Sequence, residues 1–314
     1  MHRAVCLPGL AVAFFLLAAS AKSAEFETTQ VDGGVVINVD GKLFAEYQTL
    51  TGAKPIVWPI IGPTGVEMTR TYPMRLGIEG EKKDHPHQRS LWFTHGEVNG
   101  INFWAETRGH GNIIHTEWVK VEGGPQATLI TKNDWVAPDS KKQLEDERKL
   151  VFRVGEDWRS IDFDITLKAT DGPVQFGDTK EGTMGIRLPT SMDVDSKLGG
   201  RIINSDGLID AEAWGKPAPW VDYQGPVGGQ TVGVAIMNHP SSFRYPTYWH
   251  VRNYGLFAAN PFGLHDFTQS SEIDGAYTLP AGEAITLRYR ILFHLGDEQR
   301  GKIAEAFEAY QQEP

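Results

Sequence analysis

The segment Ile161-Asp162-Phe163-Asp164-Ile165-Thr166-Leu167-Lys168 places an apolar side chain at every second position. Alternation with a period of two is typical of a strand that is buried on one face, as in an antiparallel sheet. The segment Ile285-Thr286-Leu287-Arg288-Tyr289-Arg290-Ile291 has the same pattern. These two segments predict an all-β fold built from antiparallel strands.

Shorter runs with similar character flank the two segments, at residues 35–39, 118–121, 149–154 and 232–237. Turn dipeptides of the Asp-Gly or Asn-Gly type separate many of them, at residues 32–33, 40–41, 99–100, 171–172, 206–207 and 274–275. Strands at this density, joined by such turns, are typical of a sandwich or barrel. We predict one large β-sandwich domain over residues 22–314.

One helix is predicted, at the C-terminal end of the sequence. Ile303, Ala306, Phe307 and Tyr310 form an apolar stripe at helical spacing, after a possible cap at Asp297. We expect this helix to pack on the edge of the sandwich. Residues 193–229 are rich in Gly, Pro and turn-forming residues, and we expect them to form long loops over one end.

The N-terminus has the pattern of a secretory signal peptide over residues 1–21. Arg3 is followed by an apolar run to Ala19, and Ala19-Ser20-Ala21 fits a cleavage site. The only cysteine, Cys6, lies inside this segment, so the rest of the chain has no thiolate to offer as nucleophile or ligand. We expect a periplasmic or secreted protein without stable membrane insertion.

The charge excludes some classes of partner and chemistry. The formal net charge is −10, which argues against nucleic acid, because nucleic-acid binding needs clustered Lys and Arg. The sequence has no GxSxG, Walker or dinucleotide-binding motif. We expect no cofactor.

Histidines gather in two segments that also contain Arg, Asn and Trp. The first is residues 84–96, with His85, His87 and His95, and the second is residues 237–254, with His239 and His250. Histidine titrates near neutral pH and serves as acid, base or ligand. Any one of these histidines is most simply a structural residue, but the density of polar groups favours one site assembled from both segments.

A metal site is one interpretation of the first segment. On a strand, His85 and His87 would share a face, and His95 or His239 could complete a set of three. Asp84 or Glu97 could supply a carboxylate ligand. Pro86 disturbs a regular strand and no HExxH motif is present, so we expect no metal.

A carbohydrate site is the second interpretation, because Trp stacks on the apolar faces of sugars while Arg, Asn, His and carboxylates bind hydroxyls. A His and a Glu on opposite sides of a sugar ring could act as acid and base. The catalytic candidates are His85, His87, His95, Glu181, His239 and His250. The substrate-binding candidates are Arg89, Trp92, Trp104, Arg187, Asn238, Trp249 and Arg252.

The same segments resemble a family of exported bacterial proteins known as PmoA-like or methane oxygenase PmoA, a family of unproven function. The resemblance rests on residues 85–104, 180–187, 220–225 and 238–263, and it covers essentially the whole chain after the predicted signal. It implies a large antiparallel sandwich of the galactose-mutarotase type and, by association, a role with carbohydrates. It implies no catalytic residues.

We therefore expect an exported carbohydrate-active protein that acts on a sugar or oligosaccharide. An acid–base enzyme, namely an epimerase, lyase or hydrolase, is the first hypothesis, with Glu97 or Asp222 as a possible second carboxylate beside Glu181. A non-catalytic carbohydrate-binding module and a His-ligated metal oxygenase are the alternatives. We also expect the two histidine segments to meet in one pocket, with Trp92 or Trp249 as its stacking wall.

Overall fold

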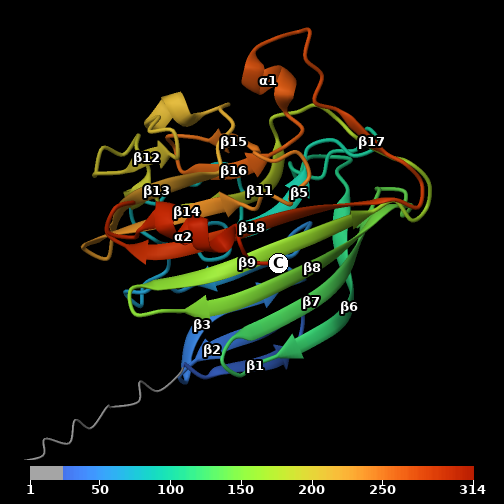
Figure 1. Cartoon of the computed structure of the whole chain (residues 1–314). Helices are drawn as coiled ribbons and strands as arrows, with labels where there is room; N and C mark the ends of the chain where they lie inside the picture. The colour runs from blue at the N-terminus through green and yellow to red at the C-terminus, as the bar shows by residue number, and fades with distance from the viewer. Residues whose placement is uncertain (1–23) are drawn as a thin grey trace, which may run out of the picture.

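The computed structural model describes residues 24–314 (Figure 1). The predicted signal peptide lies outside the described residues. In the described part of the chain, no helix is long and apolar enough to cross a membrane.

Two large antiparallel sheets form the molecule, and each has eight strands. The first sheet has the order β1 (Phe26–Val31), β2 (Gly34–Val39), β3 (Lys42–Gln48), β4 (Ile56–Ile60), β5 (Leu91–His95), β11 (Gly182–Arg187), β16 (Leu256–Asn260) and β15 (Tyr248–Val251). The second has the order β12 (Arg201–Asn204), β13 (Trp220–Val227), β14 (Gln230–Asn238), β18 (Ala284–Leu295), β9 (Trp158–Lys168), β8 (Lys142–Val154), β7 (Ala127–Val136) and β6 (Asn112–Glu122). The predicted antiparallel β-sandwich is confirmed.

Smaller elements complete the fold. A two-stranded sheet pairs β10 (Val174–Phe176) with β17 (Tyr277–Leu279). The helices are α1 (Leu264–Thr268) and α2 (Ile303–Tyr310), and two short 3₁₀ helices are η1 (Thr190–Met192) and η2 (Asp210–Ala213).

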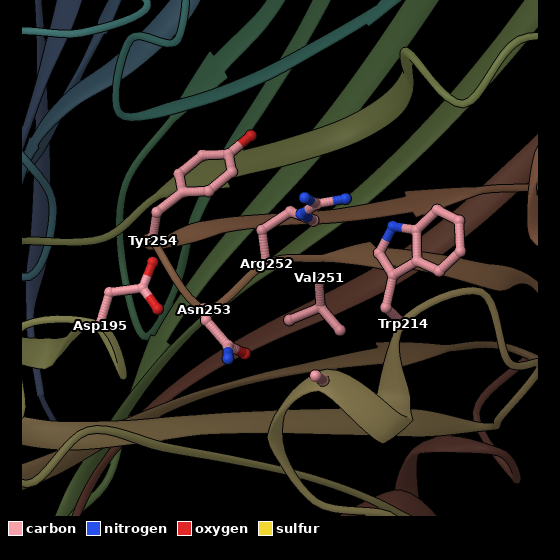
Figure 2. Close-up of a pocket in the computed structure, with 7 residues that line it drawn as sticks. Asp195, Trp214, Val251, Arg252, Asn253 and Tyr254 are labelled. Carbon is pink, nitrogen blue, oxygen red and sulfur yellow. The ribbon is translucent and has the colours of Figure 1, made fainter.

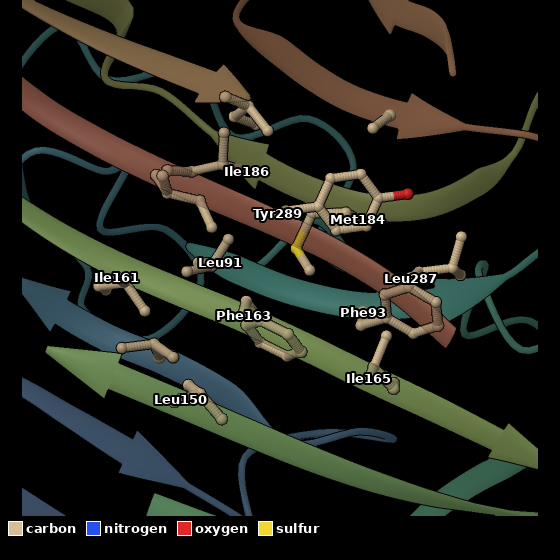
Figure 3. Close-up of a cluster of buried hydrophobic side chains, with 14 of the residues drawn as sticks. Leu91, Phe93, Leu150, Ile161, Phe163, Ile165, Met184, Ile186, Leu287 and Tyr289 are labelled. Atoms are coloured by element: carbon tan, nitrogen blue, oxygen red, sulfur yellow. The ribbon is translucent and has the colours of Figure 1, made fainter. Parts of the chain in front are cut away.

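The core lies between the two large sheets, as the alternation of the sequence predicts. The segment quoted first becomes β9, and its apolar positions Ile161, Phe163 and Ile165 are buried. They face β5 and β11 of the first sheet (Figure 3). Phe93 and Phe163 stack across the interface with ring centroids 6.5 Å apart. Burial of this alternating set is what joins the two sheets.

Asp-Gly turns set the register of the first hairpins. Asp40 and Gly41 both have positive φ, at 51° and 71°, between β2 and β3. A two-residue turn with both residues in the left-handed region matches the twist of the flanking strands. Val39 consequently pairs with Lys42 directly across the turn.

Two expectations are corrected by the structure. Helix α2 covers the outer face of the second sheet instead of its edge, and its cap is Lys302 instead of Asp297. The contacting side chains on the sheet are Trp220, Ala235, Met237 and Leu292. Residues 193–229 are not loops alone, because they contain β12 and the whole of β13, which form one edge of that sheet. Buried polar residues such as Asp222 and Gln224 interrupt the apolar pattern of β13, so the sequence did not reveal this strand.

Candidate functional site

On the outer face of the first sheet, one row of residues has two small residues between a tryptophan and a histidine. Trp92, Gly185, Ala258 and His250 are aligned across β5, β11, β16 and β15. The indole of Trp92 lies over Gly185, since a Cβ built there would be 2.6 Å from the ring. The absence of a side chain at Gly185 lets the Trp92 ring lie flat on this face of the sheet.

A surface cavity of about 360 Å³ lies at the β15 side of this face. Figure 2 shows the guanidinium of Arg252 between the rings of Trp214 and Tyr254. The distances from the guanidinium carbon to the ring centroids are 5.8 Å and 5.7 Å. Arg252 follows β15, while Trp214 follows η2, so segments distant in sequence build the cavity.

His250 is tied to the cavity wall by a hydrogen bond. The indole Nε1–H of Trp214 donates to Nδ1 of His250 at 2.9 Å. Since an indole nitrogen can only donate, Nδ1 is the acceptor and the ring proton is on Nε2. Burial, helped by the positive charges of Arg252 and Lys180, lowers the pKa of His250 to about 3. The imidazole is therefore neutral near pH 7 and offers one N–H.

His85 also contacts the ring of Tyr254. The two rings are stacked with centroids 5.5 Å apart and an angle of 6°. The neighbouring Asp84 accepts hydrogen bonds from Arg70 and, at 2.8 Å, from Arg187. Burial opposes ionisation of Asp84, but the charge of Arg187 and the hydrogen bonds outweigh it and lower its pKa to about 2. This carboxylate anchors the segment that carries His85.

Glu181 is a carboxyl group near the cavity, and its pKa is raised above that of an ordinary glutamate. It directly precedes β11 and is half-buried. Burial raises its pKa, and the positive charges of Lys180, His85 and Arg252 only partly oppose that shift. Glu181 is therefore close enough to His85 and Arg252 for their charges to act on its carboxyl group. A carboxyl with a raised pKa can hold and transfer a proton nearer to neutral pH.

A second cluster of ionisable groups flanks Trp104 on the same face. The Lys54 amine donates to the backbone oxygen of Trp104 at 3.3 Å and to Glu106 at 3.2 Å. Glu106 also pairs with Arg89. Burial lowers the pKa of Lys54 to about 8 and that of nearby His87 to about 4. His87 is therefore neutral near pH 7.

The structure brings together much of the predicted set on this face. His85 and His87 are 5.8 Å apart between ring centroids, and Trp92 and Trp104 are 5.3 Å apart. The predicted residues on or beside this face are His85, His87, Arg89, Trp92, Trp104, Glu181, Arg187, His250 and Arg252.

Four predicted residues lie elsewhere. Trp249 is fully buried in the sandwich core, where its Nε1–H donates to the oxygen of Ala218. His95 also points inward, and its Nε2 is 2.9 Å from the oxygen of Gly177. The remaining two belong to the second sheet: His239 contacts Tyr310 and the end of the chain after α2, and Asn238 binds backbone groups of Arg288 and Thr247. The parity of β5 and β15 turns His95 and Trp249 away from the outer face.

Neither proposed partner for Glu181 forms a pair with it. Asp222 is buried on the other sheet and bonds His294 at 2.9 Å. Glu97 is exposed, and its side chain lies against Gly177. The proposed metal set is not assembled either, since His95 and His239 lie apart from His85 and His87. Within residues 24–314, no group of three or more His, Cys, Asp or Glu is arranged to hold a metal ion.

Several residues of the site were missed by sequence reasoning. They are Lys54, Glu106, Trp214 and Tyr254. Tyr254 stood inside a segment singled out for its aromatic and basic residues, which was a usable signal. Lys54 and Trp214 stand outside both histidine segments, and only the pairing of the strands brings them to this face.

The fold and the site define a β-sandwich protein with an aromatic-walled cavity beside an ionisable carboxyl. The chain belongs to DUF6807, a family of unknown function, whose profile matches residues 34–308. No curated protein matches the chain.

Several solved structures are similar to it. A β-arabinopyranosidase has 12% identity and a TM-score of 0.33, covering 87% of this chain and 38% of its own. The GH36 α-galactosidase from Geobacillus stearothermophilus has 11% identity and a TM-score of 0.39, covering 87% and 40%. A galactose mutarotase-like protein from Lactobacillus casei ATCC 334 has 9% identity and a TM-score of 0.39, covering 86% and 100%. The chain thus spans about 40% of the length of the two glycosidases.

Proposed function

We propose that this protein is a carbohydrate-active enzyme that performs acid–base chemistry on a sugar or oligosaccharide at the outer face of the first sheet. The observation that carries the proposal is Glu181, a half-buried carboxyl of raised pKa beside an aromatic-walled cavity. An epimerase, a lyase and a hydrolase all need a positioned group that gains and loses a proton. Glu181 has the protonation behaviour for that role.

The surrounding groups have complementary roles in this proposal. Trp214 and Tyr254 give the cavity apolar ring walls that suit the C–H groups of a sugar, and Arg252, which lies against both rings, suits its oxygen atoms. His250 is a neutral donor through Nε2, with its orientation held by Trp214. His85, stacked on Tyr254, is the second proton-transfer group. Rings and hydrogen bonds thus orient the ligand next to Glu181.

A non-catalytic sugar-binding protein is the second candidate, and one observation favours it. The residues that line the cavity include both aromatic rings and Arg252 but not Glu181. Binding in the cavity alone would need no proton transfer. Separating these two candidates requires binding and turnover to be measured on the same variants.

The test uses Glu181→Gln, which keeps the shape of the side chain and removes its proton-transfer ability. A panel of sugars and oligosaccharides is followed by NMR for turnover and by calorimetry for binding. The proposal expects turnover to fall by about a hundredfold or more, with binding changed little, because proton transfer acts in the transition state. The control is Glu156→Gln, an exposed carboxyl in the turn between β8 and β9.

Other outcomes separate the candidates. Binding without turnover by the wild type, weakened in Trp214→Ala, would replace the enzyme by the binding protein. Unchanged turnover in Glu181→Gln would remove Glu181 from the mechanism. If no sugar is bound or converted, the proposal falls.

Export is also a proposal, based on residues 1–21 of the sequence. Expression of the whole chain in a bacterial host, followed by mass spectrometry of the periplasmic fraction, is the test. A mass that corresponds to cleavage after Ala21 is expected, and retention of the full-length chain in the cytoplasm would contradict it.

A further inference from the structure

Within residues 24–314, Arg252 differs from other buried and half-buried arginines because no hydrogen-bond acceptor contacts its guanidinium. Arg187 pairs with Asp84 at 2.8 Å, and Arg244 donates to backbone oxygens, for example that of Pro261 at 3.1 Å. The Arg252 guanidinium instead lies against the faces of Trp214 and Tyr254. No carboxylate oxygen of residues 24–314 is within 4 Å of it. A guanidinium carries five N–H donors in a planar fork, so Arg252 has its hydrogen-bonding capacity free inside the cavity.

The charges around the cavity favour an anion at Arg252. Lys180 adds a second positive charge near His250, as its effect on that imidazole indicates. Two acidic groups lie nearby: Asp266 accepts the backbone N–H of Lys180 at 3.2 Å, and Asp195 lines the same cavity. In the described part of the chain, neither carboxylate comes within 4 Å of the Arg252 guanidinium, so neither forms an ion pair with it. The Glu181 carboxylate lies 3.9 Å from the Lys180 amine, and among residues 24–314 it forms no ion pair with Arg252.

We propose that the sugar bound here carries an anionic group, a carboxylate or a sulfate ester, which Arg252 holds in the cavity. This inference rests on the proposed carbohydrate function and specifies the class of sugar. A planar carboxylate, as in a uronic acid, can accept two parallel hydrogen bonds from the guanidinium fork. The two aromatic faces hold that fork in place and shield it partly from water, which strengthens the interaction.

The experiment compares charged and uncharged forms of the same sugars. Calorimetry measures Kd for a panel of uronic-acid oligosaccharides, for their methyl esters and carboxyl-reduced forms, and for sulfated neutral oligosaccharides. The proteins are the wild type, Arg252→Gln, Arg252→Lys and the control Arg300→Gln. Arg300 is an exposed arginine near Trp158 on the other sheet.

In the wild type, an acidic sugar is expected to bind at least tenfold more tightly than its ester, and added salt should reduce the difference. In Arg252→Gln the ratio of the two Kd values, ester over acid, should be close to one. Arg252→Lys should restore part of this ratio, and Arg300→Gln should leave it as in the wild type. Preference for uronates identifies a carboxylate, whereas preference for sulfated sugars identifies a sulfate ester. Thermal unfolding of each variant excludes general loss of the fold.

Two results would overturn the inference and leave the proposed function intact. One is equal binding of acidic and neutral forms by the wild type. The other is an equal loss of both in Arg252→Gln, which would make Arg252 a general hydrogen-bond donor. If no sugar in either series binds, the proposed function fails and the inference fails with it.

Discussion

The indole of Trp214 donates its Nε1–H to Nδ1 of His250 at 2.9 Å, which ties the segment after η2 to the last strand of the first sheet. The bond fixes which nitrogen of His250 carries the proton, and it holds one aromatic wall of the cavity in place. Arg252 lies against the same indole. The orientation of a histidine and the shape of the cavity therefore depend on one hydrogen bond.

Replacement of Trp214 by Phe tests this relationship. The variant keeps an aromatic face but loses the donor, so both tautomers of His250 become accessible, and stability should fall by about 1 kcal/mol. The measurement is the nitrogen chemical shifts of the His250 ring by NMR. Trp158→Phe, at an exposed indole, is the control. Unchanged His250 shifts in Trp214→Phe would contradict the assignment.

Gly185 is expected to be needed for the position of the Trp92 ring on the outer face of the first sheet. In Gly185→Ala the new Cβ would be 2.6 Å from the indole of Trp92, so the ring must move. We expect a loss of about 1–3 kcal/mol in the free energy of unfolding, together with weaker sugar binding. Urea unfolding and calorimetry measure the two effects. The double variant Gly185→Ala/Trp92→Phe should recover stability, because the smaller ring makes room, and failure to recover would point to another cause.

His294 and Asp222 should make stability depend on pH. Burial lowers the pKa of His294, but the charge of Asp222 and the hydrogen bond to it outweigh burial, so the pKa is raised overall. The pair therefore contributes fully to the free energy of unfolding below about pH 6.5, the pKa of histidine in the unfolded chain. This contribution is lost as the pH rises through the pKa that His294 has in the folded protein. His294→Gln should therefore destabilise the protein more at pH 5.5 than at pH 9 in urea unfolding. His265→Gln, at an exposed histidine, is the control, and a loss independent of pH would refute the prediction.

A buried ion pair in the second sheet is expected to be sensitive to the loss of one partner. Arg148 and Asp146 are both fully buried and are joined by bonds of 2.8–3.2 Å. Arg148→Met leaves the carboxylate unpaired, and we expect a loss of about 3–5 kcal/mol in the free energy of unfolding. The double variant with Asp146→Leu should recover much of it. Lys141→Met, from an exposed pair, should have little effect.

The fold could be predicted from sequence because its signals are local. The alternation from Ile161 to Lys168 needs only a half-buried strand, and Asp40-Gly41 needs only a turn with positive φ. The position of α2 could not be predicted in the same way. Its apolar stripe indicates that one face of the helix is buried, but it does not indicate which surface of the sandwich covers that face.

The candidate site could be predicted only in part, since its residues come from distant segments. His85, Glu181 and Arg252 were singled out as ionisable residues in segments rich in aromatic and polar groups, and they lie near one another. His95 and Trp249 stood in the same segments, but strand parity directs them into the core.

The sequence by itself determined the class of fold, because the period of the apolar residues can be recognised within each segment, without knowing which segments it contacts. Tertiary structure alone decided which ionisable residues share the outer face. The register that aligns Trp92, Gly185, Ala258 and His250 joins strands up to 158 positions apart in the chain, and it is set by the packing of the whole sandwich. The same packing brings Trp214 to His250, and no pattern around either residue encodes that contact.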